Sequence, residues 1–145
     1  MLVQQMTIKK SVSMSGVGLH TGVQTTMTFK PAPENFGIRF RRVDLSGAPE
    51  IPADVDHVVD LKRGTTLGIG DARVHTVEHV LAAVAGMQID NILIELNNIE
   101  PPIADGSSKP FVDMLLDAGL EDQEAPKDYL IIDQVIHYQD PERGV

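Results

Sequence analysis

Apolar and polar residues alternate along much of the first half of the chain. Residues 6–14 follow this period of two, which is typical of a strand with one buried face. The alternation returns over residues 23–29, after a segment at 16–22 that contains three glycines, so the two runs predict a β-hairpin. Residues 38–43 predict a third strand, and residues 65–69 and 72–74, on either side of Gly70 and Asp71, predict a second hairpin. A short apolar run at 91–96 predicts a buried strand.

Two segments have the pattern of helices instead. Residues 76–85 are rich in apolar, helix-favouring residues and are followed by Gly86, which we expect to end the helix in the left-handed conformation. Residues 109–118 place apolar side chains on one face and follow Ser107 and Ser108, either of which can cap the helix. We therefore expect an α+β fold, a two-layer sandwich in which both helices pack on one face of a mixed sheet of about five strands.

The composition changes after the second predicted helix. Residues 121–127 are mostly acidic and polar and include a proline, which is typical of a linker between domains. Residues 129–138 return to a strand pattern, but no partner strand follows in the sequence. We therefore expect an N-terminal α+β domain at 1–120, a linker at 121–128, and the opening strand of a truncated second domain at 129–145.

The composition also excludes several classes of protein. The 145 residues carry a formal charge of −9, which argues against non-specific binding of nucleic acids because that requires a basic surface. We find no apolar run of about 18 residues for a transmembrane helix and no signal peptide, so we expect a cytoplasmic protein. Because the chain has no cysteine, a metal ion would be bound by His, Asp, Glu or carbonyl oxygens.

The candidate chemistry lies at the start of the first predicted helix. Residues four apart on a helix are rotated by roughly 40°, so His75 and His79 are expected to face the same way, with Glu78 beside them. Two such imidazoles can bind zinc, and the carboxylate can accept a proton from the bound water. The pattern His-x-x-Glu-His is also the inverzincin protease signature. On these residues alone, the alternative is a structural role, with a hydrogen-bonded His79 and a solvated Glu78.

Five short motifs, taken together, change this picture. They are Gly-Val-Gly-Leu-His at 16–20, Phe-Arg-Arg-Val-Asp at 40–44, Thr-Val-Glu-His at 76–79, Gly-Met-Gln-Ile-Asp-Asn at 86–91 and Pro-Ile-Ala-Asp-Gly-Ser at 102–107. In this order they closely resemble the UDP-3-O-acyl-N-acetylglucosamine deacetylase family, the zinc amidases of lipid A biosynthesis in Gram-negative bacteria. The likeness covers essentially the whole chain, and five ordered motifs are far more specific than any one of them.

The resemblance implies roles for individual residues. It makes His79 a ligand of Zn2+ and Glu78 the general base that activates the metal-bound water. It assigns no metal role to His75, which displaces the inverzincin interpretation. It places Leu19 and His20 near the mouth of the substrate site.

The resemblance also singles out two further positions. Asp105 belongs to the family's Asp-Gly-Ser element beside the active site, where we expect it to have a supporting role. Gly64 occupies a position at which many members have a cysteine that points at the metal site. This chain is therefore expected to lack a soft ligand that could recruit a second, inhibitory zinc ion.

Members of the family complete the zinc site with a His and an Asp from a second domain. That domain also supplies the histidine that acts as general acid and a threonine that stabilises the oxyanion. The resemblance implies that the parent protein removes acetate from UDP-3-O-(3-hydroxyacyl)-N-acetylglucosamine and that residues 1–145 alone are inactive. The alternatives are a non-catalytic fragment or binding module without tight metal and an inverzincin-like metallohydrolase.

Overall fold

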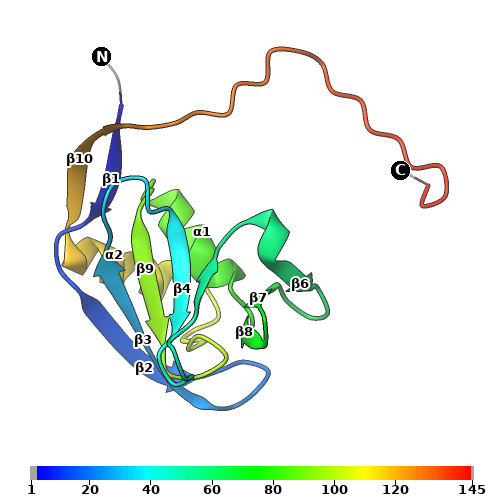
Figure 1. The fold of residues 1–145 in the computed structure, drawn as a ribbon. Coiled ribbons are helices and arrows are strands. Elements are labelled where there is room, and N and C mark those ends of the chain that lie inside the picture. Colours follow the sequence, from blue (N-terminus) through cyan, green and yellow to red (C-terminus); the bar gives the residue numbers. More distant parts are fainter. Residues whose placement is uncertain (1–2, 145) are drawn as a thin grey trace.

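The computed structural model describes residues 3–144 and has an α+β architecture built around one mixed sheet (Figure 1). Three of the four pairs of neighbouring strands in this sheet are antiparallel, whereas the pair β4 and β9 is parallel. The expected mixed sheet of about five strands is therefore confirmed. In spatial order the strands are β2 (Val12–Val17), β3 (Gln24–Pro31), β9 (Ile92–Leu96), β4 (Ile38–Arg42) and β5 (Glu50–Pro52).

The two faces of the main sheet differ in polarity. Phe29, Ile94 and Phe40 lie side by side across β3, β9 and β4, and each has no exposed surface. The opposite face carries charged side chains, and Glu95 there forms ion pairs with Lys30 at 2.7 Å and Arg41 at 3.1 Å. One face is thus buried in the core and the other faces solvent, as the alternation along these strands predicts.

Both helices cover the buried face of the sheet (Figure 1). The helix α2 (Lys109–Ala118) has the predicted bounds, and the hydroxyl of Ser107 accepts a hydrogen bond from the Lys109 N–H at 3.1 Å. The helix α1 (Glu78–Gly86) begins two residues later than expected. The expected left-handed end at Gly86 is wrong, because Gly86 is the last helical residue and Gln88 has the positive φ, 58°.

A small antiparallel sheet lies beside the main one. It contains the second predicted hairpin, β7 (Thr66–Ile69) with β8 (Ala72–Val74), and a third strand, β6 (Val58–Asp60), that pairs with β7. The 3-10 helix η1 (Val55–His57) precedes β6 and is capped by Asp54, whose side chain accepts from the His57 N–H. The loop between β6 and β7 contains Gly64.

The first predicted strand, at residues 6–14, is divided between two sheets. Its first part belongs to β1 (Gln4–Ile8), which pairs with β10 (Leu120–Pro126), and its second part belongs to β2. Most of the segment expected as an irregular linker is therefore an edge strand. The polar composition of this segment did not indicate a strand. Side chains that point to solvent can be polar in a strand, because it is the backbone that hydrogen-bonds to the neighbouring strand.

Residues 127–144 run away from the sheets as extended chain and turns (Figure 1). Residues 129–138, expected as a strand, do not pair with another strand in the described part of the chain. Large apolar side chains of this segment are exposed, including Leu130 at 93% and Ile131 at 80%. The division of the chain into domains stays a prediction. Neither of the two helices formed by residues 3–144 is long and apolar enough to cross a bilayer.

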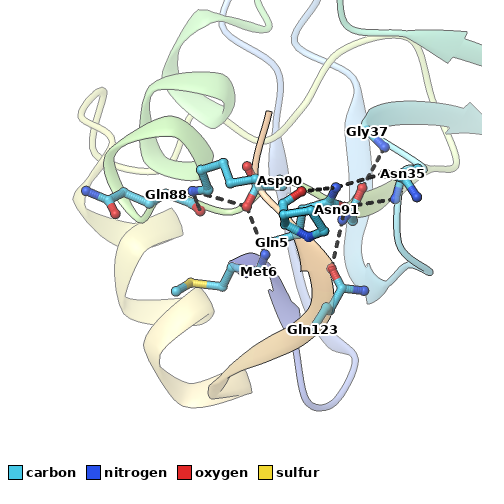
Figure 2. Close-up of polar contacts among 10 residues, drawn as sticks. Gln5, Met6, Asn35, Gly37, Gln88, Asp90, Asn91 and Gln123 are labelled. Atoms are coloured by element: carbon cyan, nitrogen blue, oxygen red, sulfur yellow. Dashed lines mark hydrogen bonds and ion pairs between the residues drawn. The ribbon is translucent and has the colours of Figure 1, made fainter. Parts of the chain in front are cut away.

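A polar cluster around Asn91 joins the β1–β10 pair to the main sheet (Figure 2). The Asn91 side chain accepts from the Gly37 N–H at 2.8 Å and donates to Gln5 at 2.8 Å and Gln123 at 2.7 Å. Asp90, the preceding residue, accepts from the Met6 N–H at 2.8 Å. Because Asn91 is buried and uses its whole amide group, it holds three segments of the chain together.

Candidate active site

Glu78 and His79 are the first two residues of α1. One oxygen of Glu78 accepts a hydrogen bond from the Thr65 N–H at 3.1 Å, so the loop before β7 holds the carboxylate in place. A negative charge is also favoured in the first turn of a helix by the helix dipole. The His79 ring is half-buried and makes no hydrogen bond to any other group of residues 3–144. Its nitrogens are therefore free of hydrogen bonds to the described residues.

His75 lies outside the helix, which corrects the expectation that His75 and His79 share a helix face. Thr76, between them, has a φ of +54°, so the backbone is not helical at that point. The Nδ1 atom of His75 lies 2.9 Å from the Thr66 hydroxyl on β7. The His75 ring is thus tied to the small sheet, and the spacing of four residues does not place it beside His79.

A buried carboxylate, which the sequence analysis did not identify, lies next to these residues. Glu100 has no exposed surface. It accepts hydrogen bonds from the Thr21 N–H at 2.9 Å, the Thr21 hydroxyl at 2.7 Å and the Thr76 hydroxyl at 2.7 Å. The His20 N–H lies 3.2 Å from both of its oxygens. The available signal was an acidic residue between Ile99 and two prolines in an otherwise unpatterned loop.

The hydrogen bonds to Glu100 determine its protonation. Burial of the carboxyl group raises its pKa, but hydrogen bonds from Thr21 and Thr76 and from the backbone N–H groups lower it more. The pKa of Glu100 falls from 4.5 to about 2 as a result. Glu100 is therefore a buried, charged acceptor at neutral pH.

Thr76 has an unusual backbone conformation for its residue type. A β-branched residue with a φ of +54° is rare, and such a conformation costs about 1–3 kcal/mol. Thr76 is only 6% exposed, and its hydroxyl donates to Glu100. The surrounding contacts thus hold the residue that lies two positions before Glu78 in a strained conformation.

A pocket of about 250 Å³ opens beside these residues. His20 and Gly64 both line it, and the His20 ring donates from Nε2 to the Arg63 carbonyl at 2.9 Å, which closes one side. A Cβ atom placed on Gly64 would lie 3.1 Å from a Glu78 carboxylate oxygen. Glu78 is not itself a lining residue, but it lies against Gly64, which is one. The other lining residues are Thr21, Asp60, Lys62, Arg63, Thr66, His75 and Thr76.

The remaining two predicted residues, Leu19 and Asp105, are not among those that line the pocket. Leu19 is 53% exposed in the turn between β2 and β3. Asp105 is exposed and accepts from the N–H and the hydroxyl of Ser107 at 2.9 and 2.8 Å. These two hydrogen bonds lower the pKa of the Asp105 carboxyl group. In this structure Asp105 organises the turn that leads into α2.

His79 could supply one ligand to a metal ion. Neither nitrogen of its imidazole hydrogen-bonds to another described residue, so one is available to bind a metal ion, and Glu78 beside it is held by a backbone N–H. Residues 3–144 contain no group of three or more His, Asp or Glu side chains arranged to hold a metal ion. Since catalytic zinc sites normally have three protein ligands, the described residues do not form a complete catalytic zinc site by themselves.

Comparisons with known proteins relate the whole chain to one family. A family model described as UDP-3-O-acyl N-acetylglycosamine deacetylase matches residues 5–145. The chain is 57% identical over 145 residues to a bifunctional enzyme LpxC/FabZ of Chlorobaculum tepidum, an alignment that covers 100% of this chain and 31% of that protein.

Two further relatives are each named UDP-3-O-acyl-N-acetylglucosamine deacetylase. The one from Teredinibacter turnerae is 46% identical over 142 residues, which cover 98% of this chain and 47% of the relative. The one from Myxococcus xanthus is 47% identical over 139 residues, which cover 96% of this chain and 44% of the relative. The chain thus spans less than half the length of these three relatives.

Proposed function

The chain belongs to the UDP-3-O-acyl N-acetylglycosamine deacetylase family, and from this membership we propose that it forms the first part of a zinc-dependent amide hydrolase. The reaction is removal of acetate from UDP-3-O-(3-hydroxyacyl)-N-acetylglucosamine in lipid A biosynthesis, in the cytoplasm. The observation that carries the proposal is the pair Glu78 and His79 at the start of α1, next to a pocket.

We assign separate roles to the two residues. His79 supplies one imidazole ligand for Zn2+, consistent with a ring that has no hydrogen-bonding partner in residues 3–144. Bound zinc polarises a carbonyl group and lowers the pKa of water to about 7. Glu78 accepts the proton from the water that attacks the acetyl carbonyl. The Thr65 N–H keeps the Glu78 carboxylate in one orientation for this transfer.

The pocket bounded by His20 and Gly64 is the part of the substrate site that this chain contributes. It has room beside Glu78 because residue 64 has no side chain. Leu19, on the exposed turn next to His20, lies where it can contact a substrate that enters the pocket. Asp105 has a supporting role through the turn before α2.

We propose that the other zinc ligands, the general acid and the oxyanion donor come from a second domain. Residues 1–120 then form the N-terminal domain, residues 121–128 connect it to the second, and residues 129–145 begin the second domain. On this proposal the isolated 145-residue chain is inactive. The exposed apolar side chains at 129–138 support it, because such residues are normally buried against a partner.

The decisive experiment is Glu78→Ala in the full-length protein. We expect turnover to fall at least ~10²-fold while the zinc content is kept, because the proton acceptor is lost but the ligand His79 remains. Glu95→Gln is the matched control, since it removes a carboxylate from the solvent-facing side of the sheet. Full activity of Glu78→Ala would contradict the assignment.

A second candidate function concerns residues 1–145 alone, which would form a binding module without tight metal. One observation favours this function. His79 is the only zinc ligand that we assign in the described residues, whereas catalytic zinc sites normally have three protein ligands. Metal analysis and a deacetylation assay on this chain separate the two functions. Stoichiometric tight zinc with turnover would refute the binding module.

A further inference from the structure

Glu100 is a charged side chain for which the proposed mechanism has no role. It has no exposed surface, yet it is ionised at neutral pH because four donors surround it. Burying a charge costs much free energy unless hydrogen bonds compensate it. The hydrogen bonds to Glu100 compensate this cost, and we therefore ask what the buried carboxylate does for the site.

The donors to Glu100 come from two segments that are far apart in the sequence. One oxygen accepts from the Thr76 hydroxyl, and the other accepts from the N–H and hydroxyl of Thr21. Thr21 belongs to the turn between β2 and β3, whereas Thr76 lies just before α1. Glu100 itself lies in the loop after β9, so one side chain connects three segments.

These connections reach the residues around the pocket directly. Thr21, Thr76 and His20 all line the pocket, and all three donate to Glu100. Thr76 also lies two residues before Glu78 in a left-handed conformation that its residue type disfavours. The direction in which the chain enters α1 thus depends on the hydrogen bond from Thr76 to Glu100.

The packing around Glu100 is tight enough to select glycine at a neighbouring position. A Cβ atom on Gly18 would lie 2.6 Å from the Thr21 hydroxyl oxygen and would also collide with the Glu100 carboxylate. The φ of Gly18 is not in the left-handed region, so the backbone conformation does not require glycine there. The space that the Glu100 carboxylate and Thr21 occupy is what excludes a side chain.

We propose that Glu100 is a positioning residue, which fixes the start of α1 with Glu78 and His79 relative to the turn that carries His20. The proposal rests on the proposed function, in which Glu78 and His79 perform the chemistry. Glu100 acts through Thr76 on one side and through His20 and Thr21 on the other. Residues that hydrogen-bond directly to metal ligands change metal affinity or activity by roughly 10–100-fold when they are removed, and this range is the upper bound for Glu100, which acts through Thr76, His20 and Thr21.

The first test is Glu100→Gln in the full-length protein. The amide has one acceptor oxygen, so it cannot accept from Thr21 and Thr76 on opposite sides as the carboxylate does. We expect kcat to fall roughly 10- to 100-fold, with a weaker zinc affinity and little change in KM. Glu95→Gln, which removes a carboxylate from the solvent-facing side of the sheet, is the control and should keep wild-type values.

A pair of variants at Thr76 separates positioning from stability. Thr76→Ser keeps the hydroxyl, whereas Thr76→Gly removes it but tolerates the positive φ. We expect Thr76→Ser to stay within about 3-fold of wild-type kcat and zinc affinity, and Thr76→Gly to lose about 10-fold in both. If Glu100→Gln does not fold, these two Thr76 variants still test whether the hydrogen bond to Glu100 positions the start of α1.

The outcomes distinguish the two proposals. If Glu78→Ala is fully active, the proposed function fails. If Glu78→Ala is inactive but folded Thr76→Gly and Glu100→Gln keep wild-type kcat and zinc affinity, the positioning role is wrong and Glu100 is only structural. A loss of kcat and zinc affinity in Thr76→Gly that Thr76→Ser does not share supports the positioning role.

Discussion

A carboxylate oxygen of Glu78 lies 3.1 Å from the position that a Cβ atom on Gly64 would occupy. Any side chain at residue 64 would therefore contact the proposed general base. The φ of Gly64 lies outside the left-handed region, so the backbone accepts other residues at this position. The identity of residue 64 thus affects the pocket through side-chain contact and not through backbone strain.

We predict that Gly64→Cys makes the full-length enzyme sensitive to excess zinc. A thiolate beside Glu78 would complete a second, softer zinc site, so the inhibitory zinc concentration should fall at least ~10-fold relative to wild type. Activity measured against zinc concentration tests this prediction. Gly64→Ser has a similar size and a harder oxygen ligand, so it is the control; equal zinc sensitivity in the two variants would contradict the prediction.

Glu100 makes the stability of the fold dependent on pH. Its pKa is about 2 in the folded chain and near 4.5 when the chain is unfolded, so its stabilisation is complete above about pH 4.5 and is lost as pH falls through 2. The shift corresponds to roughly 3 kcal/mol at neutral pH. The free energy of unfolding of wild type and Glu100→Gln should therefore converge as the pH is lowered below 4.5. A difference that does not change between pH 7 and pH 2 would exclude this linkage.

His75 and His79 should differ in their effect on zinc. We predict that His75→Ala keeps the zinc content of the full-length protein, because the His75 ring is engaged with Thr66 and lies outside α1. His79→Ala should lose zinc, with at least ~10-fold weaker affinity, because a ligand is removed. Metal analysis after dialysis provides the comparison. Loss of zinc in His75→Ala would favour the inverzincin-like alternative.

The polar cluster around Asn91 should contribute strongly to stability (Figure 2). Asn91→Ala leaves the half-buried Gly37 N–H and the Gln5 and Gln123 side chains without this partner. We expect the free energy of unfolding to fall by roughly 2 kcal/mol or more, measured by urea denaturation. Gln134→Ala, which removes an exposed amide, is the control and should change the free energy of unfolding by less than about 0.5 kcal/mol. Similar values for the two variants would show that the cluster is not stabilising.

The secondary structure was predictable wherever a local pattern was sufficient. The bounds of α2 follow from an apolar stripe and a capping serine, and the hairpin of β2 and β3 follows from alternation around a glycine-rich turn. Alternation indicates which side chains are buried but not which strand is the partner. This is why residues 6–14 divide between two sheets and why β10, which is mostly acidic and polar, was expected to be a linker.

The sequence by itself determined the α+β class, the two helices and, through five ordered motifs, the candidates Glu78 and His79. Only the tertiary structure excluded His75 from the helix, because a left-handed Thr76 separates it from α1. The tertiary structure alone also identified Glu100, whose donors lie 24, 79 and 80 residues away. Periodicity reports burial within one element. It carries no information about hydrogen bonds that form between distant loops after the chain has folded.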